Sequence, residues 1–358
     1  MPTMTQQTPP AGTRQRIFGG VDTHGQTHTA AVVTDAGAML AARQFPADAA
    51  GYRQLTSWLT GHGQLVKIGV EGTGSYGAGL TRHLQAAGHT VIEVNQPDKA
   101  VRRRVGKSDP IDAEAAARAA LSGRAAAIPK DTTAGVEALR NLRVARNDAI
   151  KHRADTQRRL RSMLVTAPEP VKAALAGLTI LKLTRKAAAF RPDLTAAAIG
   201  DVTAAVKLAL ASLARTWLNH RDEIHQLDKT ILPLVKRLAP HLLARPGVGP
   251  DVASRLLVTA GQNAHRLHSE AALAALTGVS PVPASSGKTN RHRLNRGGDR
   301  QANNAIWRIA MTRMAHDATT KQTIERHLAR GKTKKEAVRI LKRAIIRDIY
   351  RALRLDMP

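Results

Sequence analysis

The order of short apolar runs between residues 17 and 94 constrains the fold of this chain more than any other sequence feature. Three β-type runs come first, and they predict an antiparallel meander because only short turns separate them. A helical pattern, a buried strand, a second helical pattern ending at Gly88 and a further strand follow. Hairpin strands followed by alternating helices and strands predict an α/β domain with a mixed sheet.

The remaining chain divides by composition, with the α/β domain assigned to residues 15–130 in a ribonuclease-H-like (RuvC-like) order. Residues 1–14 are polar and aperiodic, which predicts a disordered tail. Strands vanish from about residue 131, so we expect a helical linker or coiled coil over 131–240. A mainly α domain is expected over 241–358, where 22 Lys or Arg face 8 Asp or Glu, a net charge of +14.

Apolar residues in the second half of the helical region recur at alternating spacings of three and four. This seam predicts either a coiled coil that joins subunits into a dimer or tetramer, or a plain helix pair within one chain. Pro233 lies inside the seam and should kink or end the helix. The seam residues are Leu210, Leu213, Trp217, His220, Ile224, Leu227, Ile231, Leu234 and Leu238.

The charge balance indicates the partner. Lys and Arg number 55 against 27 Asp and Glu, a formal net charge of +28. Such an excess favours an extended polyanion, and nucleic acid first of all, over a small acidic substrate. Aromatic residues make up only 3%, so backbone charge should dominate over base stacking. No apolar run approaches the roughly 18 residues of a spanning helix, and cysteine is absent, so we expect a cytoplasmic protein without membrane contact.

Four carboxylates are the candidate metal-binding and catalytic residues. Asp22 lies in the first strand, Glu71 at the carboxyl end of a later strand, and Asp109 and Asp112 at the start of a helix, where a spacing of three puts them on one face. Such a set would repel unless divalent cations lay within it, and oxygen ligands suit Mg²⁺ or Mn²⁺, which support phosphoryl transfer. Alternatively, Asp109 before Pro110 caps the helix and Asp22 is a turn residue.

Basic residues directly before the two aspartates are expected to bind the phosphate backbone. They are Lys99, Arg102, Arg103, Arg104 and Lys107.

These residues carry a family resemblance. "GVDTH", "VEGTGSYG" and "KSDPIDAEAAARA" resemble the three blocks of the DEDD transposases with a RuvC-like domain, those of the insertion sequence one-hundred-ten family. Downstream, "LLARPGVGPDVASRLLVTAGQ" and the segment ending in "RGGDRQANNAIW" are similar to that family's second transposase domain. Together the matches span nearly all of residues 17 to about 320. Where many members have a lysine soon after the first aspartate, this chain has His24 and Gly25.

The resemblance implies a DNA transposase or recombinase. The four carboxylates would bind Mg²⁺, and a serine of the second domain would form a covalent phosphoserine link to DNA. By position that serine is Ser286, with Ser285 as the neighbour that could be confused with it. The resemblance also implies a guide RNA, encoded by the element itself, that pairs with donor and target DNA.

The serine block can also be interpreted without the family. A Ser-Ser-Gly in a proline-containing loop is either an ordinary turn or a hydroxyl among phosphate-binding cations. Serine is a poor nucleophile unaided, so metal ions bound by the other domain would have to activate it. The cations are Lys288, Arg291, Arg293, Arg296 and Arg300.

Two further segments have a structural and a functional interpretation. Gly247 and Gly249 lie between helical stretches and predict a helix-hairpin-helix that binds phosphate through backbone N–H groups, or an ordinary turn. The last helix should start in a capping box at Thr333 and pack one apolar face. Its opposite face, which includes Lys342, is expected to be solvated or to touch nucleic acid.

Three hypotheses follow: a serine-using transposase, a RuvC-like nuclease, and a nucleic-acid-binding protein without catalysis. The nuclease would cut structured DNA with the carboxylates alone and ignore Ser286. The binding protein would retain its function without the four carboxylates and without Ser286.

Overall fold

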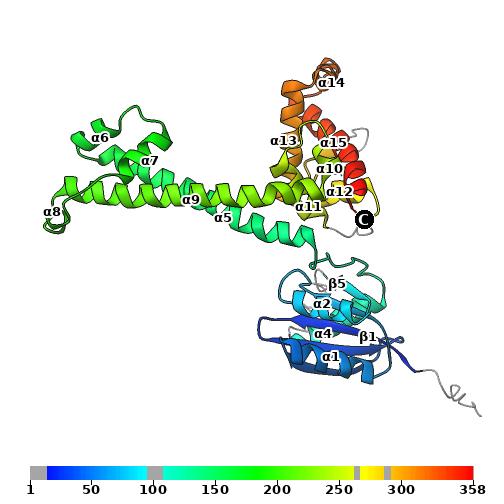
Figure 1. The fold of residues 1–358 in the computed structure, drawn as a ribbon. Helices are drawn as coiled ribbons and strands as arrows, with labels where there is room; N and C mark the ends of the chain where they lie inside the picture. Colours follow the sequence, from blue (N-terminus) through cyan, green and yellow to red (C-terminus); the bar gives the residue numbers. More distant parts are fainter. Residues whose placement is uncertain (1–13, 95–107, 262–266, 286–291, 358) are drawn as a thin grey trace, which may run out of the picture. The chain divides into compact units, whose positions relative to one another are not determined.

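The computed structural model describes residues 14–94, 108–261, 267–285 and 292–357, and it divides into two compact units (Figure 1). The first unit comprises Met1–Ala134 and Gly261–His268, and the second comprises Gly135–Ala260 and Ser269–Pro358. Among the described residues, no helix combines the length and apolarity that crossing a membrane requires.

The first unit is built on a five-stranded sheet of order β3-β2-β1-β4-β5. The β1–β2 and β2–β3 pairs are antiparallel, whereas β4 pairs parallel with both β1 and β5. The predicted meander and mixed sheet are therefore confirmed, and the arrangement is consistent with a ribonuclease-H-like domain. The elements are β1 (Arg16–Thr23), β2 (Thr27–Thr34), β3 (Met39–Pro46), α1 (Ala49–Gly61), β4 (Gln64–Glu71), α2 (Ala78–Ala86), β5 (Val91–Val94) and α4 (Asp109–Leu121).

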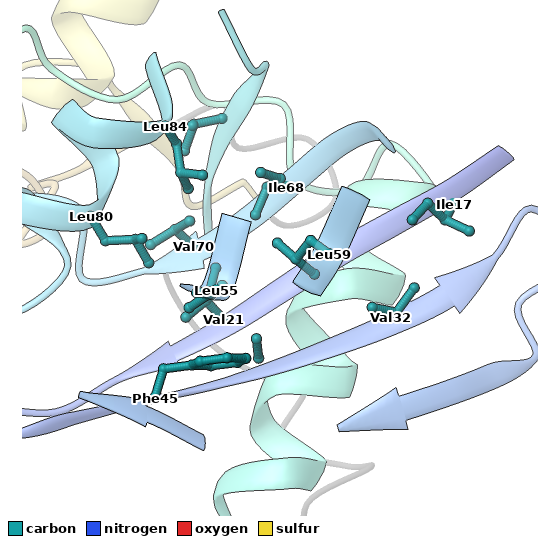
Figure 2. Close-up of a cluster of buried hydrophobic side chains, with 12 residues drawn as sticks. Ile17, Val21, Val32, Phe45, Leu55, Leu59, Ile68, Val70, Leu80 and Leu84 are labelled. Carbon is teal, nitrogen blue, oxygen red and sulfur yellow. The ribbon is translucent and has the colours of Figure 1, made fainter. Parts of the chain in front are cut away.

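One face of the sheet packs against α1 and α2. Residues that alternate along the strands, such as Val21 on β1 and Val70 on β4, contact Leu55 and Leu59 of α1 in a single core cluster (Figure 2). All four are fully buried. Each such side chain contributes about 1.5–3 kcal/mol by leaving water, so this face stabilises the unit.

The opposite face of the sheet packs against α4, and two glycines determine how closely. A Cβ on Gly20 would lie 2.1 Å from the carbonyl oxygen of Ala113, and a Cβ on Gly69 would lie 2.4 Å from that of Ala116. Gly20 and Gly69 are paired neighbours on β1 and β4. The helix therefore lies backbone-on-backbone against the strands, which fixes the place where α4 begins.

The second unit contains two long antiparallel helices, α5 (Gly135–Thr166) and α9 (Val202–Leu238), which lie side by side in Figure 1. The α9 seam faces α5 of the same chain: Trp217 is buried, and its indole N–H donates to Gln157 at 3.3 Å. This contact corresponds to the second alternative for the seam, a helix pair within one chain. The helix does not end at Pro233, which is exposed and lies within α9.

Short helices connect or follow this pair. α6 (Glu169–Leu175), α7 (Ile180–Ala188) and α8 (Leu194–Ala198) link α5 to α9. The C-terminal part comprises α10 (Pro240–Leu243), α11 (Pro250–Ala260), α12 (Glu270–Leu276), α13 (Arg300–His316), α14 (Ala318–Ala329) and α15 (Lys334–Asp356), with a ribbon of β6 (Val282–Pro283) and β7 (His292–Arg293) that the sequence did not predict.

A buried ion-pair cluster joins the long helices to this C-terminal part. Arg143 of α5 is 5% exposed, and it donates to the carboxylate of Asp251 on α11 at 3.1 Å. Arg146, Arg255 and Arg308 pair with the same carboxylate. Burial opposes ionisation of Asp251, but these guanidinium groups outweigh it and hold the pKa of Asp251 below its usual value.

Candidate metal centre and serine loop

Asp22 and Glu71 lie side by side at the carboxyl ends of two parallel strands. Val21 pairs with Val70, so the next residue on each strand is one of the two acids. The hydroxyl of Thr23 donates to the main-chain oxygen of Glu71 at 2.9 Å and ties the strand ends together. Side chains alternate along a strand, so both acids project to the face that carries α4.

Asp109 and Asp112 occupy the first turn of α4, at the same edge of the sheet. Ser108 precedes the helix in an extended conformation, so Ser108 is the N-cap and the interpretation of Asp109 as the cap is wrong. Asp112 is 4% exposed, a degree of burial that a carboxylate tolerates only with strong compensation. The structure therefore brings three of the four predicted carboxylates into one electrostatic group, with Glu71 on the neighbouring strand.

His24 lies between two of these carboxylates. Its Nε2 atom is 3.1 Å from Asp22 Oδ2 and 3.5 Å from Asp109 Oδ1. One ligand atom from each of the three residues lies within 4.8 Å of the other two. The sequence pattern does not single out His24 as a metal ligand. The available signal was its position two residues after Asp22, in the tight turn that ends the first strand.

Burial and like charge both act on Asp22. Burial raises the pKa of Asp22, and Asp109 and Asp112 raise it further, whereas His24 lowers it. In the protein alone, the Asp22 carboxylate is therefore harder to ionise than usual. A divalent cation at this position would reverse that penalty, so the donor set fits a Mg²⁺ or Mn²⁺ ion.

The predicted serine site lies only partly within the described residues. Ser286, Lys288 and Arg291 are outside them, as are the basic residues expected before the aspartates, namely Lys99, Arg102, Arg103, Arg104 and Lys107. Ser285 is described and exposed. Among the remaining predicted phosphate-binding residues, the exposed cations are Arg293, Arg296 and Arg300.

The segment that leads from α12 to Ser285 is anchored at its start by a partly buried network. Asn303 of α13 donates to the main-chain oxygens of Thr277 and Gly278, at 2.8 and 3.1 Å, where the loop leaves α12. Lys342 of α15 donates to the side-chain oxygen of Asn303 at 2.6 Å. Lys342 is 9% exposed, and burial lowers its pKa. The prediction that Lys342 belongs to a solvated face is therefore wrong, because the partner on α13 cannot be inferred from helical periodicity.

Gly247 and Gly249 lie in the turn between α10 and α11. Gly247 has a φ of +78°, and a Cβ there would lie 3.3 Å from the main-chain oxygen of Ile309 on α13. The side chain of Arg313 donates to the oxygen of Pro246 at 2.9 Å. Packing against α13 thus accounts for Gly247, while a Cβ on Gly249 would meet nothing within 4 Å.

Comparison with known proteins agrees with the fold, whose mixed sheet is consistent with a ribonuclease-H-like domain of the DEDD class. Residues 19–167 match the DEDD transposase domain of IS110, and residues 239–325 match the domain described as "Transposase IS116/IS110/IS902 family". The chain belongs to the IS110 family of transposases.

Two proteins of Streptomyces coelicolor are similar to the chain. A 43.6 kDa protein of the insertion element IS110 is 32% identical over 155 residues, which is 42% of this chain and 38% of the relative. A mini-circle protein assigned to IS117 is 27% identical over 328 residues, which is 76% of this chain and 78% of the relative. The first match thus spans well under half of its relative, and the second spans most of both chains.

Proposed function

We propose that the chain is a Mg²⁺- or Mn²⁺-dependent transposase that cleaves and rejoins DNA at the ends of an insertion sequence. The observation that carries this proposal is the convergence of Asp22, His24 and Asp109 within 4.8 Å at one edge of the sheet. Family membership supports the same activity. Carboxylates that are buried beside one another are retained at a cost to stability, which a catalytic role explains.

The four acids have distinct parts in the proposed site. Asp22 and Asp112 are buried, whereas the side chain of Asp109 is 44% exposed and open to incoming DNA; all three would hold the ion. Glu71 would complete the set from the neighbouring strand. A divalent ion bound here supplies positive charge to the phosphodiester and to its attacking and leaving oxygens.

We further propose that Ser286 is the nucleophile. Its hydroxyl oxygen would bond to phosphorus, one deoxyribose oxygen would leave, and the serine proton would pass to solvent or to a neighbouring base, which conserves the phosphodiester energy for rejoining. Arg293, Arg296 and Arg300 would neutralise the phosphates around this serine. The family resemblance of the sequence around Ser286 supports this step.

The partners in this proposal are nucleic acids and further copies of the chain. A net charge of +28 supports binding to extended phosphate backbones, both DNA ends and a guide RNA encoded by the element. Activation of a serine by ions held in another domain calls for domain closure or for a second subunit, which supports a homo-oligomer. The turn at Gly247 and Gly249 is proposed as an additional backbone contact to phosphate.

Trapping of a covalent protein–DNA adduct tests this function. The full chain is incubated with Mg²⁺, element-end DNA and RNA transcribed from the element's flanks, and adducts are separated under denaturing conditions. We expect adducts with wild type and with the control variants Ser285→Ala and Asp35→Asn, the latter altering an exposed acid away from the sheet edge. Ser286→Ala and Asp22→Asn should form none.

The alternatives give different results in the same assay. Cleavage that persists in Ser286→Ala without an adduct would replace the transposase with a RuvC-like nuclease. Binding of DNA without cleavage by any variant would leave a nucleic-acid-binding protein. An adduct that is lost in Ser285→Ala and retained in Ser286→Ala would move the nucleophile by one residue and leave the rest of the proposal intact.

A further inference from the structure

We propose that His24 is a direct ligand of the divalent ion and that it biases this site toward Mn²⁺ over Mg²⁺. The inference deepens the proposed function and rests on its metal-dependent chemistry. It concerns a residue that lies outside the four predicted carboxylates.

The distances around His24, which include a hydrogen bond to Asp22, are also compatible with neighbouring ligands on one ion. An ion bound at about 2.1 Å to ligands at right angles keeps those ligand atoms about 3 Å apart. His24 Nε2 lies 3.1 Å from Asp22 Oδ2 and 3.5 Å from Asp109 Oδ1. Small side-chain adjustments therefore suffice to place all three atoms around one ion.

The hairpin between β1 and β2 fixes the backbone of His24. Its main-chain N–H donates to the carbonyl of Thr27 at 3.0 Å, which closes a short turn directly after β1. The side chain of His24 is 51% exposed, so ions can reach the imidazole from solvent. The backbone is thus held while the ring stays accessible, which is the combination that a ligand on a catalytic edge needs.

The other histidine of this hairpin belongs to the opposite face. His28 is fully buried and stacks on the ring of Tyr52 from α1, with ring centroids 5.6 Å apart. It pairs with Thr23, one residue after Asp22, so its side chain points away from α4. Of these two histidines, only His24 faces the carboxylates.

The donor type determines the metal preference. Mg²⁺ is a hard cation that favours oxygen ligands and retains its waters, whereas imidazole nitrogen suits transition metals. Mn²⁺ accepts both carboxylate oxygen and imidazole nitrogen at octahedral sites. A nitrogen ligand beside Asp22 and Asp109 therefore contributes more to Mn²⁺ binding than to Mg²⁺ binding.

Pulsed electron paramagnetic resonance of Mn²⁺ bound to the full-length protein tests the ligand directly. An imidazole ligand gives a ¹⁴N coupling in the electron spin echo modulation, without any need for activity. We expect this coupling in wild type and in the control His89→Gln, whose half-buried histidine precedes β5 and lies at the other end of the parallel strands. His24→Gln should lose it.

Calorimetric titration of the same proteins tests the preference. Mn²⁺ affinity should fall roughly 10-fold or more in His24→Gln, while Mg²⁺ affinity changes only a few-fold. Mn²⁺ that binds through Asp22, as shown by its loss in Asp22→Asn, but without ¹⁴N coupling would overturn the role of His24 and leave the carboxylate centre standing. Equal losses of Mn²⁺ and Mg²⁺ affinity would overturn the preference. Absence of any Asp22-dependent Mn²⁺ binding would overturn both this inference and the proposed metal centre.

Discussion

Replacing Gly20 with alanine should damage both the stability of the sheet and the metal centre, because Gly20 sets the height of α4 above the strands. The added Cβ would lie 2.1 Å from the oxygen of Ala113 and 2.1 Å from the nitrogen of Ala117. Both are main-chain atoms of the helix and cannot rotate away. Ordinary van der Waals contact begins at 3.4 Å. The helix must therefore move outward by about 1.3 Å, or the strand must bend by as much.

The magnitude of the effect follows from that displacement. Overpacking of this kind costs about 1–3 kcal/mol of unfolding free energy. Asp112 moves with the helix while Asp22 stays on its strand, so Mn²⁺ affinity should fall roughly 10- to 100-fold, as it does when a supporting group around a metal is lost. A misplacement of about 1 Å can also slow DNA cleavage on the order of 100-fold.

Urea unfolding is monitored by hydrogen-exchange mass spectrometry of peptides from β1 and α4, which reports the stability of this unit alone. Calorimetry measures Mn²⁺ binding. Gly61→Ala is the matched control, because a Cβ there meets nothing within 4 Å, and it should be neutral or slightly stabilising. A Gly20→Ala protein as stable as wild type, with unchanged Mn²⁺ affinity, would refute the reasoning.

Three further predictions concern other parts of the molecule. Asp22→Asn should stabilise the metal-free protein at neutral pH, because burial raises the pKa of Asp22; the gain should vanish as pH falls below the ordinary value of 3.8, which unfolding across a pH series measures. Asp251→Asn should lower the free energy of unfolding by about 3–5 kcal/mol, because it leaves Arg143 buried without its carboxylate. Equal urea midpoints for this variant and wild type would contradict this prediction. Lys342→Met should cost about 1–3 kcal/mol by leaving the oxygen of Asn303 unpaired, and should reduce adduct formation while Mn²⁺ affinity stays unchanged.

The α/β sheet could be predicted from the sequence because the patterns that indicate strands and turns lie within short segments of the chain. Alternation and turn residues define β1 to β3, and parallel strands bring their carboxyl ends to one edge, so the proximity of Asp22 and Glu71 follows from topology. Helical spacing likewise predicts that Asp109 and Asp112 share one face of their helix. The position of His24 beside these carboxylates could not be predicted, because a single histidine in a turn carries no periodic signal.

Structural features that depend on tertiary contacts cannot be predicted from local sequence patterns. Gly20 and Gly69 are ordinary residues in a strand until the backbone of α4 is placed over them. Lys342 satisfies the pattern of a solvated face, and only the position of Asn303 shows why it is buried. The β6–β7 ribbon has two residues in each strand, too few for alternation to be detected.

The central claim is that a divalent ion held by the carboxylate edge contacts the phosphate that is cut. It is tested most directly by replacing one nonbridging oxygen of that phosphate with sulfur in element-end DNA and measuring cleavage. Sulfur binds Mg²⁺ poorly and Mn²⁺ better. We predict that one diastereomer is cleaved much more slowly than all-oxygen DNA in Mg²⁺ and recovers in Mn²⁺, whereas sulfur one nucleotide away has no effect. Equal slowing in both metals would contradict the account.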